Sequence, residues 1–170
     1  GLYKTYVRCE PDWDALTGEL GSRFPVLQNH SFKVWPACAM TRPTNAATLN
    51  LRREYGLHAN DVDELLVLGG SMHSELLSEP LDHKRRPETS IDAKYSIPFT
   101  TAIAMAKGNV TLRAFTDEGL HDPEVLAMAQ KVRFQPLPPE ENHQMPAIEI
   151  HTHDGRRLYE RVKSIPGDPN

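Results

Sequence analysis

The most apolar helical segment of the chain reads S-I-P-F-T-T-A-I-A-M-A-K-G over residues 96–108. Ser96 at its start can cap a helix, because a serine hydroxyl accepts a hydrogen bond from a free backbone N–H. Pro98 suits the first turn, and Gly108 suits the position just past the end. We therefore expect a helix over residues 97–107, at the centre of the core.

Three more helices are predicted. Residues 43–55 begin with a proline, are rich in Ala and Leu, and stop before Gly56. Residues 122–131 begin with Asp122 as a cap, and a proline follows it at the first helical position. Residues 11–20 predict a shorter helix with aspartates near its start, where they complement the helix dipole.

Short strands are expected around these helices. The apolar run at residues 63–68 predicts one of them. Three more candidates lie near the C-terminus, over residues 132–137, 147–152 and 156–162. The dipeptide Asp154-Gly155 joins the last two and predicts a hairpin.

A further extended segment is expected at residues 31–35, entering Pro36. Its alternation places Phe32 and Val34 on one face and Lys33 on the other. Whether this segment is a strand or merely extended, Lys33, on the same face as Trp35, is therefore predicted to point away from Phe32 and Val34.

Residues 69–87 are interpreted as an irregular polar connection, because glycines and prolines bracket them. The charged trio within this connection, Lys84, Arg85 and Arg86, is expected to be solvated.

Strands around central helices indicate an α+β fold, in which a small antiparallel or mixed sheet packs against three to four helices. The chain has 170 residues, of which 39% are hydrophobic, which is enough apolar material for one ordinary core. We expect a single domain over residues 1–170.

The composition argues against two classes of partner. The formal net charge is -4, so the chain has no general attraction to nucleic acid or to an anionic membrane surface. Its apolar runs are far shorter than the roughly 20 residues that a membrane span requires. We expect neither nucleic acid nor membrane as a partner.

The two cysteines, Cys9 and Cys38, form no C-x-x-C pair that would indicate a zinc or redox site. Reduced thiols and a cytoplasmic location are the expectation. The chain opens at Gly1 without a secretory leader pattern, and we expect it to be part of a longer protein.

Four groups of residues recur in this order in a known family. They are F-K-V-W-P-A-C at 32–38, D-A-K-Y-S-I-P-F at 92–99, F-T-D-E at 115–118 with D-P-E-V at 122–125, and P-G-D-P-N at 166–170. With the hairpin before the last, they cover nearly the whole chain. The chain resembles the C-terminal domain of the MmgE/PrpD family.

The resemblance implies a fold and an activity. Members include 2-methylcitrate dehydratase, cis-aconitate decarboxylase and iminodisuccinate epimerase-like proteins, which pair a large helical domain with a smaller lid. It implies a lid domain, a helical domain of the same enzyme as partner, a homodimer and no cofactor. The implied substrates are small di- or tricarboxylates, and the implied reaction is that of a lyase or isomerase.

Lys33 matches a lysine that relatives use at the active site, so the resemblance implies a catalytic role for it. A lysine beside a cleft can clamp a carboxylate or stabilise negative charge that develops at the neighbouring carbon. The alternative is an exposed strand lysine without a role.

Two residues depart from the family pattern, because Cys38 and Arg42 stand where some relatives carry histidines. Arg42 can bind a carboxylate through two parallel hydrogen bonds, which a neutral imidazole cannot do. Cys38 is either part of the substrate site or a small buried residue.

Lys94, Tyr95 and Ser96 lie at the start of the central helix, where backbone N–H groups and the dipole favour an anion. We expect them to bind a substrate carboxylate. Phe99 stands where several relatives have an active-site tyrosine, and its better interpretation is core packing, which argues against a decarboxylase.

His151 and His153 are two residues apart in a predicted strand and therefore on one face. A His-x-His pair can ligate zinc, but no third ligand lies at a sequence spacing typical of zinc sites. We therefore expect no metal. The alternative from another functional class is a non-catalytic binding or assembly module that completes a partner.

Overall fold

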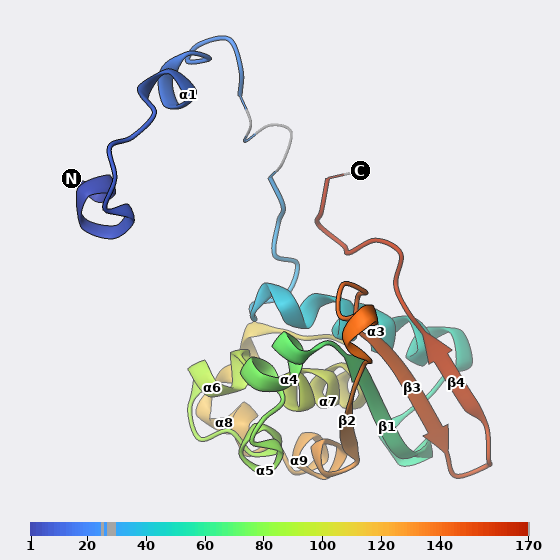
Figure 1. The fold of residues 1–170 in the computed structure, drawn as a ribbon. Coiled ribbons are helices and arrows are strands. Elements are labelled where there is room, and N and C mark those ends of the chain that lie inside the picture. Colours follow the sequence, from blue (N-terminus) through green and yellow to red (C-terminus); the bar gives the residue numbers. More distant parts are fainter. Residues whose placement is uncertain (25, 27–29, 170) are drawn as a thin grey trace. The chain divides into compact units, whose positions relative to one another are not determined.

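The computed structural model describes residues 1–24, 26 and 30–169 (Figure 1). The chain forms two compact units, one of residues 1–32 with 168–170 and the other of residues 33–167. The second unit contains the sheet and nearly all of the buried hydrophobic residues.

The central helix is α7, Ile97–Lys107, with the bounds that its capping residues predict. The Ser96 hydroxyl accepts a hydrogen bond from Phe99 N at 3.0 Å, and Gly108 ends the helix with φ 71°. Every residue from Ile97 to Ala106 is buried, so α7 is the core helix that its composition predicts.

Two long helices pack against α7, namely α3, Arg42–Tyr55, and α9, Pro123–Gln130. Asp122 caps α9 through its carboxylate, which accepts hydrogen bonds from the two backbone N–H groups of Glu124 and Val125. In the first unit, α1 covers only Trp13–Thr17, shorter than the predicted residues 11–20.

The sheet has four strands in the order β2-β1-β3-β4: β1 is Val62–Gly69, β2 is Val132–Pro136, β3 is Ala147–Thr152 and β4 is Arg157–Glu160. The β1–β2 pair is parallel and the other two pairs are antiparallel, so the sheet is mixed. Helix α3 packs on β3 and β4, and α7 packs on β2 (Figure 1). The predicted α+β class is confirmed.

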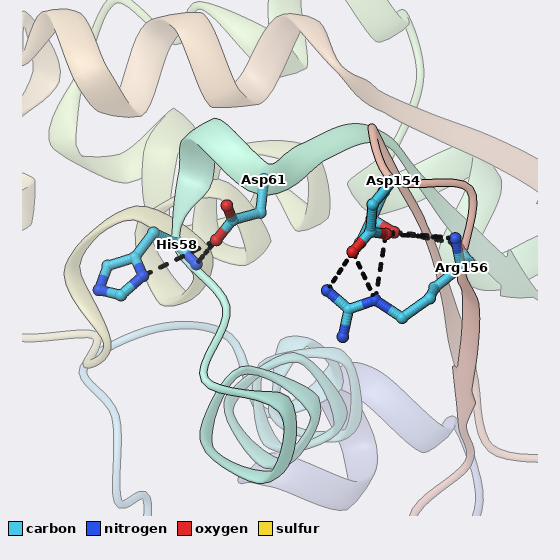
Figure 2. A network of polar contacts seen from close by, with 5 residues as sticks. His58, Asp61, Asp154 and Arg156 are labelled. Atoms are coloured by element: carbon cyan, nitrogen blue, oxygen red, sulfur yellow. Dashed lines mark hydrogen bonds and ion pairs between the residues drawn. The ribbon is translucent and has the colours of Figure 1, made fainter.

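The hairpin between β3 and β4 turns at Asp154-Gly155, as predicted. Gly155 has φ 87°, a conformation that glycine adopts without strain. The Asp154 carboxylate binds the Arg156 guanidinium at 2.8 to 3.0 Å (Figure 2), and this bond lowers the pKa of the carboxyl. A neighbouring turn is closed by Asp61, whose carboxylate accepts from His58 N at 2.7 Å.

Of the two possibilities for residues 31–35, a strand or an extended segment, the strand is wrong, because the segment bends from Val34 onward and pairs with no strand. Phe32 is 69% exposed and Val34 is 48% exposed, so the alternation does not produce one buried face. Trp35 is the buried residue that anchors the segment. A single apolar–polar alternation cannot specify a strand without a neighbour that supplies ladder hydrogen bonds.

The interpretation of residues 69–87 as irregular is also wrong, since they contain α4, Ser71–Leu77, and α5, Leu81–Arg85. Two further short helices, α6, Ser90–Lys94, and α8, Asp117–Leu120, were not predicted either. Helices this short are marginal by local propensity, and tertiary contacts stabilise them.

The charged trio at the end of α5, Lys84, Arg85 and the C-terminal capping residue Arg86, is not uniformly solvated. Arg85 is only 8% exposed, and its Nε and Nη2 both donate to the Val132 carbonyl, at 3.1 and 2.6 Å. Lys84 is half-buried, and Arg86 alone is exposed. Arg85 therefore ties α5 to the first residue of β2.

Short turns complete the described part of the chain. They are a π turn at Tyr3–Val7 and 3₁₀ turns at Ala39–Thr41, Ala59–Asp61, Leu112–Phe115 and Pro139–Glu141. Within the described residues, no helix has the length and hydropathy to cross a bilayer.

Candidate functional site

Two of the segments that carry predicted site residues are joined by their backbones. Cys38 N donates to the Lys94 carbonyl at 2.9 Å, although the two residues are far apart in the sequence. The buried side chains of Trp35 and Ala37 hold the first segment against the core. Helix α6 ends at Lys94, shortly before α7 begins. This hydrogen bond therefore holds the segment that precedes α3 beside the segment that precedes α7.

Lys33 lies at the start of the first segment and is exposed. It stands in irregular backbone five positions before Cys38, not on a strand edge. The Lys33 side chain is therefore exposed, whereas the residues that follow it, from Trp35 onward, are anchored in the core.

Arg42 and Cys38 flank the turn that starts α3. Arg42 is the first residue of α3 and is 7% exposed, and its Nε donates to the Ala39 carbonyl at 3.4 Å. Cys38 carries a half-buried free thiol, and its carbonyl accepts from Thr41 Oγ1 at 2.8 Å. The turn places the guanidinium of Arg42 close to the backbone of the segment that follows Lys33.

Lys94 and Tyr95 differ in their surroundings. The ammonium of the half-buried Lys94 lies 5.7 Å from the centroid of the Phe115 ring, in a cation–π contact. The Tyr95 side chain is 50% exposed. Of this pair, Lys94 is fixed by a neighbour and Tyr95 reaches solvent.

Ser96 and Phe99 are fully buried. The Ser96 hydroxyl donates to the Lys84 carbonyl at 2.5 Å and accepts from Phe99 N, so both of its hydrogen-bonding roles are used within the domain. Phe99 packs in the hydrophobic core, as predicted. Sequence patterns identified Ser96 as a cap but gave no sign of its bond to α5.

Lys84, which is expected from the sequence to be solvated, is half-buried. Its ammonium donates to the Leu76 carbonyl at 3.0 Å and to the Tyr95 carbonyl at 2.8 Å. Burial lowers the pKa of Lys84, and the charge of Asp92 opposes that shift. Lys84 therefore positions the Lys94–Ser96 segment, and no signal in the K-R-R run distinguishes it from an exposed lysine.

Replacement of Ser96 by alanine is expected to lower the free energy of unfolding by about 1 to 2 kcal/mol, because it removes the cap of α7. The bond to the Lys84 carbonyl is lost at the same time. Urea denaturation measures the difference. Ser164→Ala, at an exposed serine, is the control, and equal stability of the two variants would contradict the role of the cap.

The two histidines at the end of β3 each face a carboxylate. His151 Nε2 lies 2.7 Å from Glu149 Oε1 and its Nδ1 lies 3.7 Å from Glu64 Oε1. His153 Nδ1 lies 3.7 Å from Asp63 Oδ1. Among the residues described, no group of three or more His, Cys, Asp or Glu side chains is arranged to hold a metal ion.

The chain was compared with known proteins. Residues 35–170 match the MmgE/PrpD C-terminal domain, a family that is generally enzymatic and dehydratase-like. No curated protein gives a significant match. The match begins at Trp35, two residues after Lys33, and covers Cys38, Arg42, the Lys94–Ser96 segment, α7, α9 and the whole sheet. The chain therefore belongs to the MmgE/PrpD family, as its four sequence segments indicate.

Proposed function

We propose that the chain is the lid domain of a cofactor-independent lyase or isomerase that acts on a small di- or tricarboxylate. The family match supports an enzyme of dehydratase type. In this proposal residues 1–170 together form the lid domain, and the helical domain of the same enzyme supplies the general base. We further propose that the enzyme is a cytoplasmic homodimer.

One observation carries the proposal, which is the hydrogen bond between Cys38 N and the Lys94 carbonyl. It joins the segment that bears Lys33 and Arg42 to the one that bears Lys94. Three cationic side chains thus come from two segments fixed together, which suits a ligand with several carboxylates.

The proposed chemistry starts from the difficulty of forming negative charge at a carbon beside a carboxylate. A preorganised cation stabilises this charge without reorganisation of the site. Lys33 takes that role, and Arg42, Lys94, Tyr95, Ser96 and Cys38 form the substrate-binding surface, Ser96 through the backbone that it caps. Closure of the lid over the cleft excludes water.

The position of Phe99 bears on the type of reaction. Its side chain is fully buried and has no hydroxyl, so it supplies no acid to a substrate. In this proposal dehydration and epimerisation do not require a hydroxyl at position 99. They are therefore favoured over decarboxylation.

The proposal is tested by activity of the intact enzyme, in which this chain is joined to its helical domain. The substrates are 2-methylcitrate, cis-aconitate and iminodisuccinate, without added cofactor and with a chelator present. We expect turnover of at least one of them. If none is converted while the protein is folded, the proposal fails, and the result favours the alternative of a non-catalytic binding or assembly module.

A further inference from the structure

An open pocket of about 310 Å³ lies beside the proposed site. One wall is formed by Ala39, Met40 and Pro43, which belong to the same segment as Cys38 and Arg42. The opposite wall is the loop of residues 142–146, and the remaining lining residues are His73 and Ile165. Its volume is at the lower end of the range of small-molecule sites, roughly 300 to 1,000 Å³.

The polar group that stands out in this pocket is the imidazole of His73, on α4. The residue is partly buried, and in the described part of the chain its Nδ1 atom is buried without a hydrogen-bond partner. Burial lowers the pKa of His73, which favours the neutral form of the ring. A buried N–H without an acceptor is costly, so a neutral ring that carries its proton on Nε2 avoids that cost at Nδ1. His73 is one of the residues that line the pocket.

Gln144 supplies a second donor. Its Oε1 accepts a hydrogen bond from Arg161 Nη1, which leaves the amide N–H groups of Gln144 for a ligand. Within the described residues, Arg161 Nε is buried and has no partner of its own. The positive charge of Arg161 therefore lies next to the Gln144 amide and favours an electron-rich ligand at the amide N–H groups.

The loop that carries Gln144 is held against the start of α4. Ser71 N donates to Asn142 Oδ1 at 3.3 Å. A Cβ atom at Gly70 would lie 3.0 Å from the Asn142 carbonyl oxygen, so a larger residue there would push the loop slightly away. These contacts hold the loop that carries Gln144 close to the helix that carries His73.

We propose that this pocket binds one carboxylate of a small organic acid, which accepts hydrogen bonds from Nε2 of the neutral His73 and from the amide of Gln144. The carbon chain of the acid packs on Met40 and Met145. This inference rests on the proposed function in one respect, namely that the ligand is a small carboxylic acid. His73 is then a binding residue in the lid itself.

The experiment titrates the full chain with tricarballylate, an unreactive tricarboxylate, at neutral pH. Imidazole ¹⁵N shifts report on each histidine, and calorimetry gives the dissociation constant. We expect a saturable shift at His73 and none at His83, which is exposed on α5. His73→Phe, which keeps a ring but removes both nitrogens, is expected to raise Kd about tenfold or more.

Two further variants separate a binding role from a structural one. His73→Gln restores a donor near the position of Nε2 and is expected to return Kd to within about threefold of the wild type. His83→Phe is the matched control and should bind as the wild type does. Unchanged binding by a folded His73→Phe chain, or no binding of tricarballylate by the wild-type chain, would overturn the inference.

The proposed function fails on a different result. It is tested by turnover of the intact enzyme, whereas the pocket is tested by binding to this chain. A converted substrate together with an unperturbed His73 would retain the enzyme and remove the pocket from its site.

Discussion

Replacing Lys33 with alanine is expected to lower kcat/KM of the intact enzyme by about 10²- to 10³-fold, the effect of removing one preorganised donor from a developing negative charge. Stability should barely change, because Lys33 is exposed and, among the described residues, makes no hydrogen bond or ion pair. Surface substitutions of this kind alter the free energy of unfolding by less than about 0.5 kcal/mol. Steady-state kinetics and thermal denaturation measure the two effects.

The control for Lys33 is Lys163→Ala, which removes the same charge from another exposed position of the second unit. It should leave kcat/KM unchanged. Lys33→Arg keeps the charge but changes its geometry, so it should recover part of the lost activity. Equal activity of Lys33→Ala and the wild type would remove Lys33 from the site.

Replacing Arg85 with methionine is expected to lower the free energy of unfolding by about 2 to 3 kcal/mol, because the substitution removes two charged hydrogen bonds from the Val132 carbonyl. That carbonyl keeps only the longer bond from Arg133 Nη1, at 3.3 Å. Arg85 Nε and Nη2 bind the Val132 carbonyl, and the side chain is almost fully buried. Its link to Asp82 at 3.3 Å adds little, since Asp82 is exposed. Chemical denaturation followed by circular dichroism gives the change.

The neighbouring residue offers a matched control. Arg86→Met makes the same substitution at the exposed residue that follows α5 and should alter stability by less than about 0.5 kcal/mol. If the two variants were equally stable, the contact between α5 and β2 would not contribute as we describe.

The long elements of the fold could be predicted because each carries its own boundary signals. Ser96 and Gly108 bound α7, Asp122 bounds α9, and Gly56 ends α3 in a left-handed conformation. The hairpin at Asp154 followed from a dipeptide with a strong turn preference. In each case the local sequence and the tertiary structure agree, which is the condition for prediction from sequence.

The errors arose where distant contacts determine the structure. Helix α5 depends on the bonds of Arg85 to Val132 and of Lys84 to Tyr95, and neither partner is near in sequence. The segment around Lys33 alternates like a strand but has no neighbouring strand to pair with. Local patterns carry no information on such partners.

The same limit applies to the candidate site. The resemblance identified Cys38 and Lys94 as separate positions, and only the fold reveals that their backbones are hydrogen-bonded. His73 carried no spacing signal at all, and its buried Nδ1 became apparent only with the pocket around it.

The central claim is that Lys33 meets a substrate carboxylate at the junction with the helical domain. A crystal structure of the intact enzyme with tricarballylate bound tests it most directly. The account predicts a distance of about 2.7 to 2.9 Å between Lys33 Nζ and a carboxylate oxygen. A bound ligand whose carboxylates all lie beyond about 6 Å from that nitrogen would contradict it.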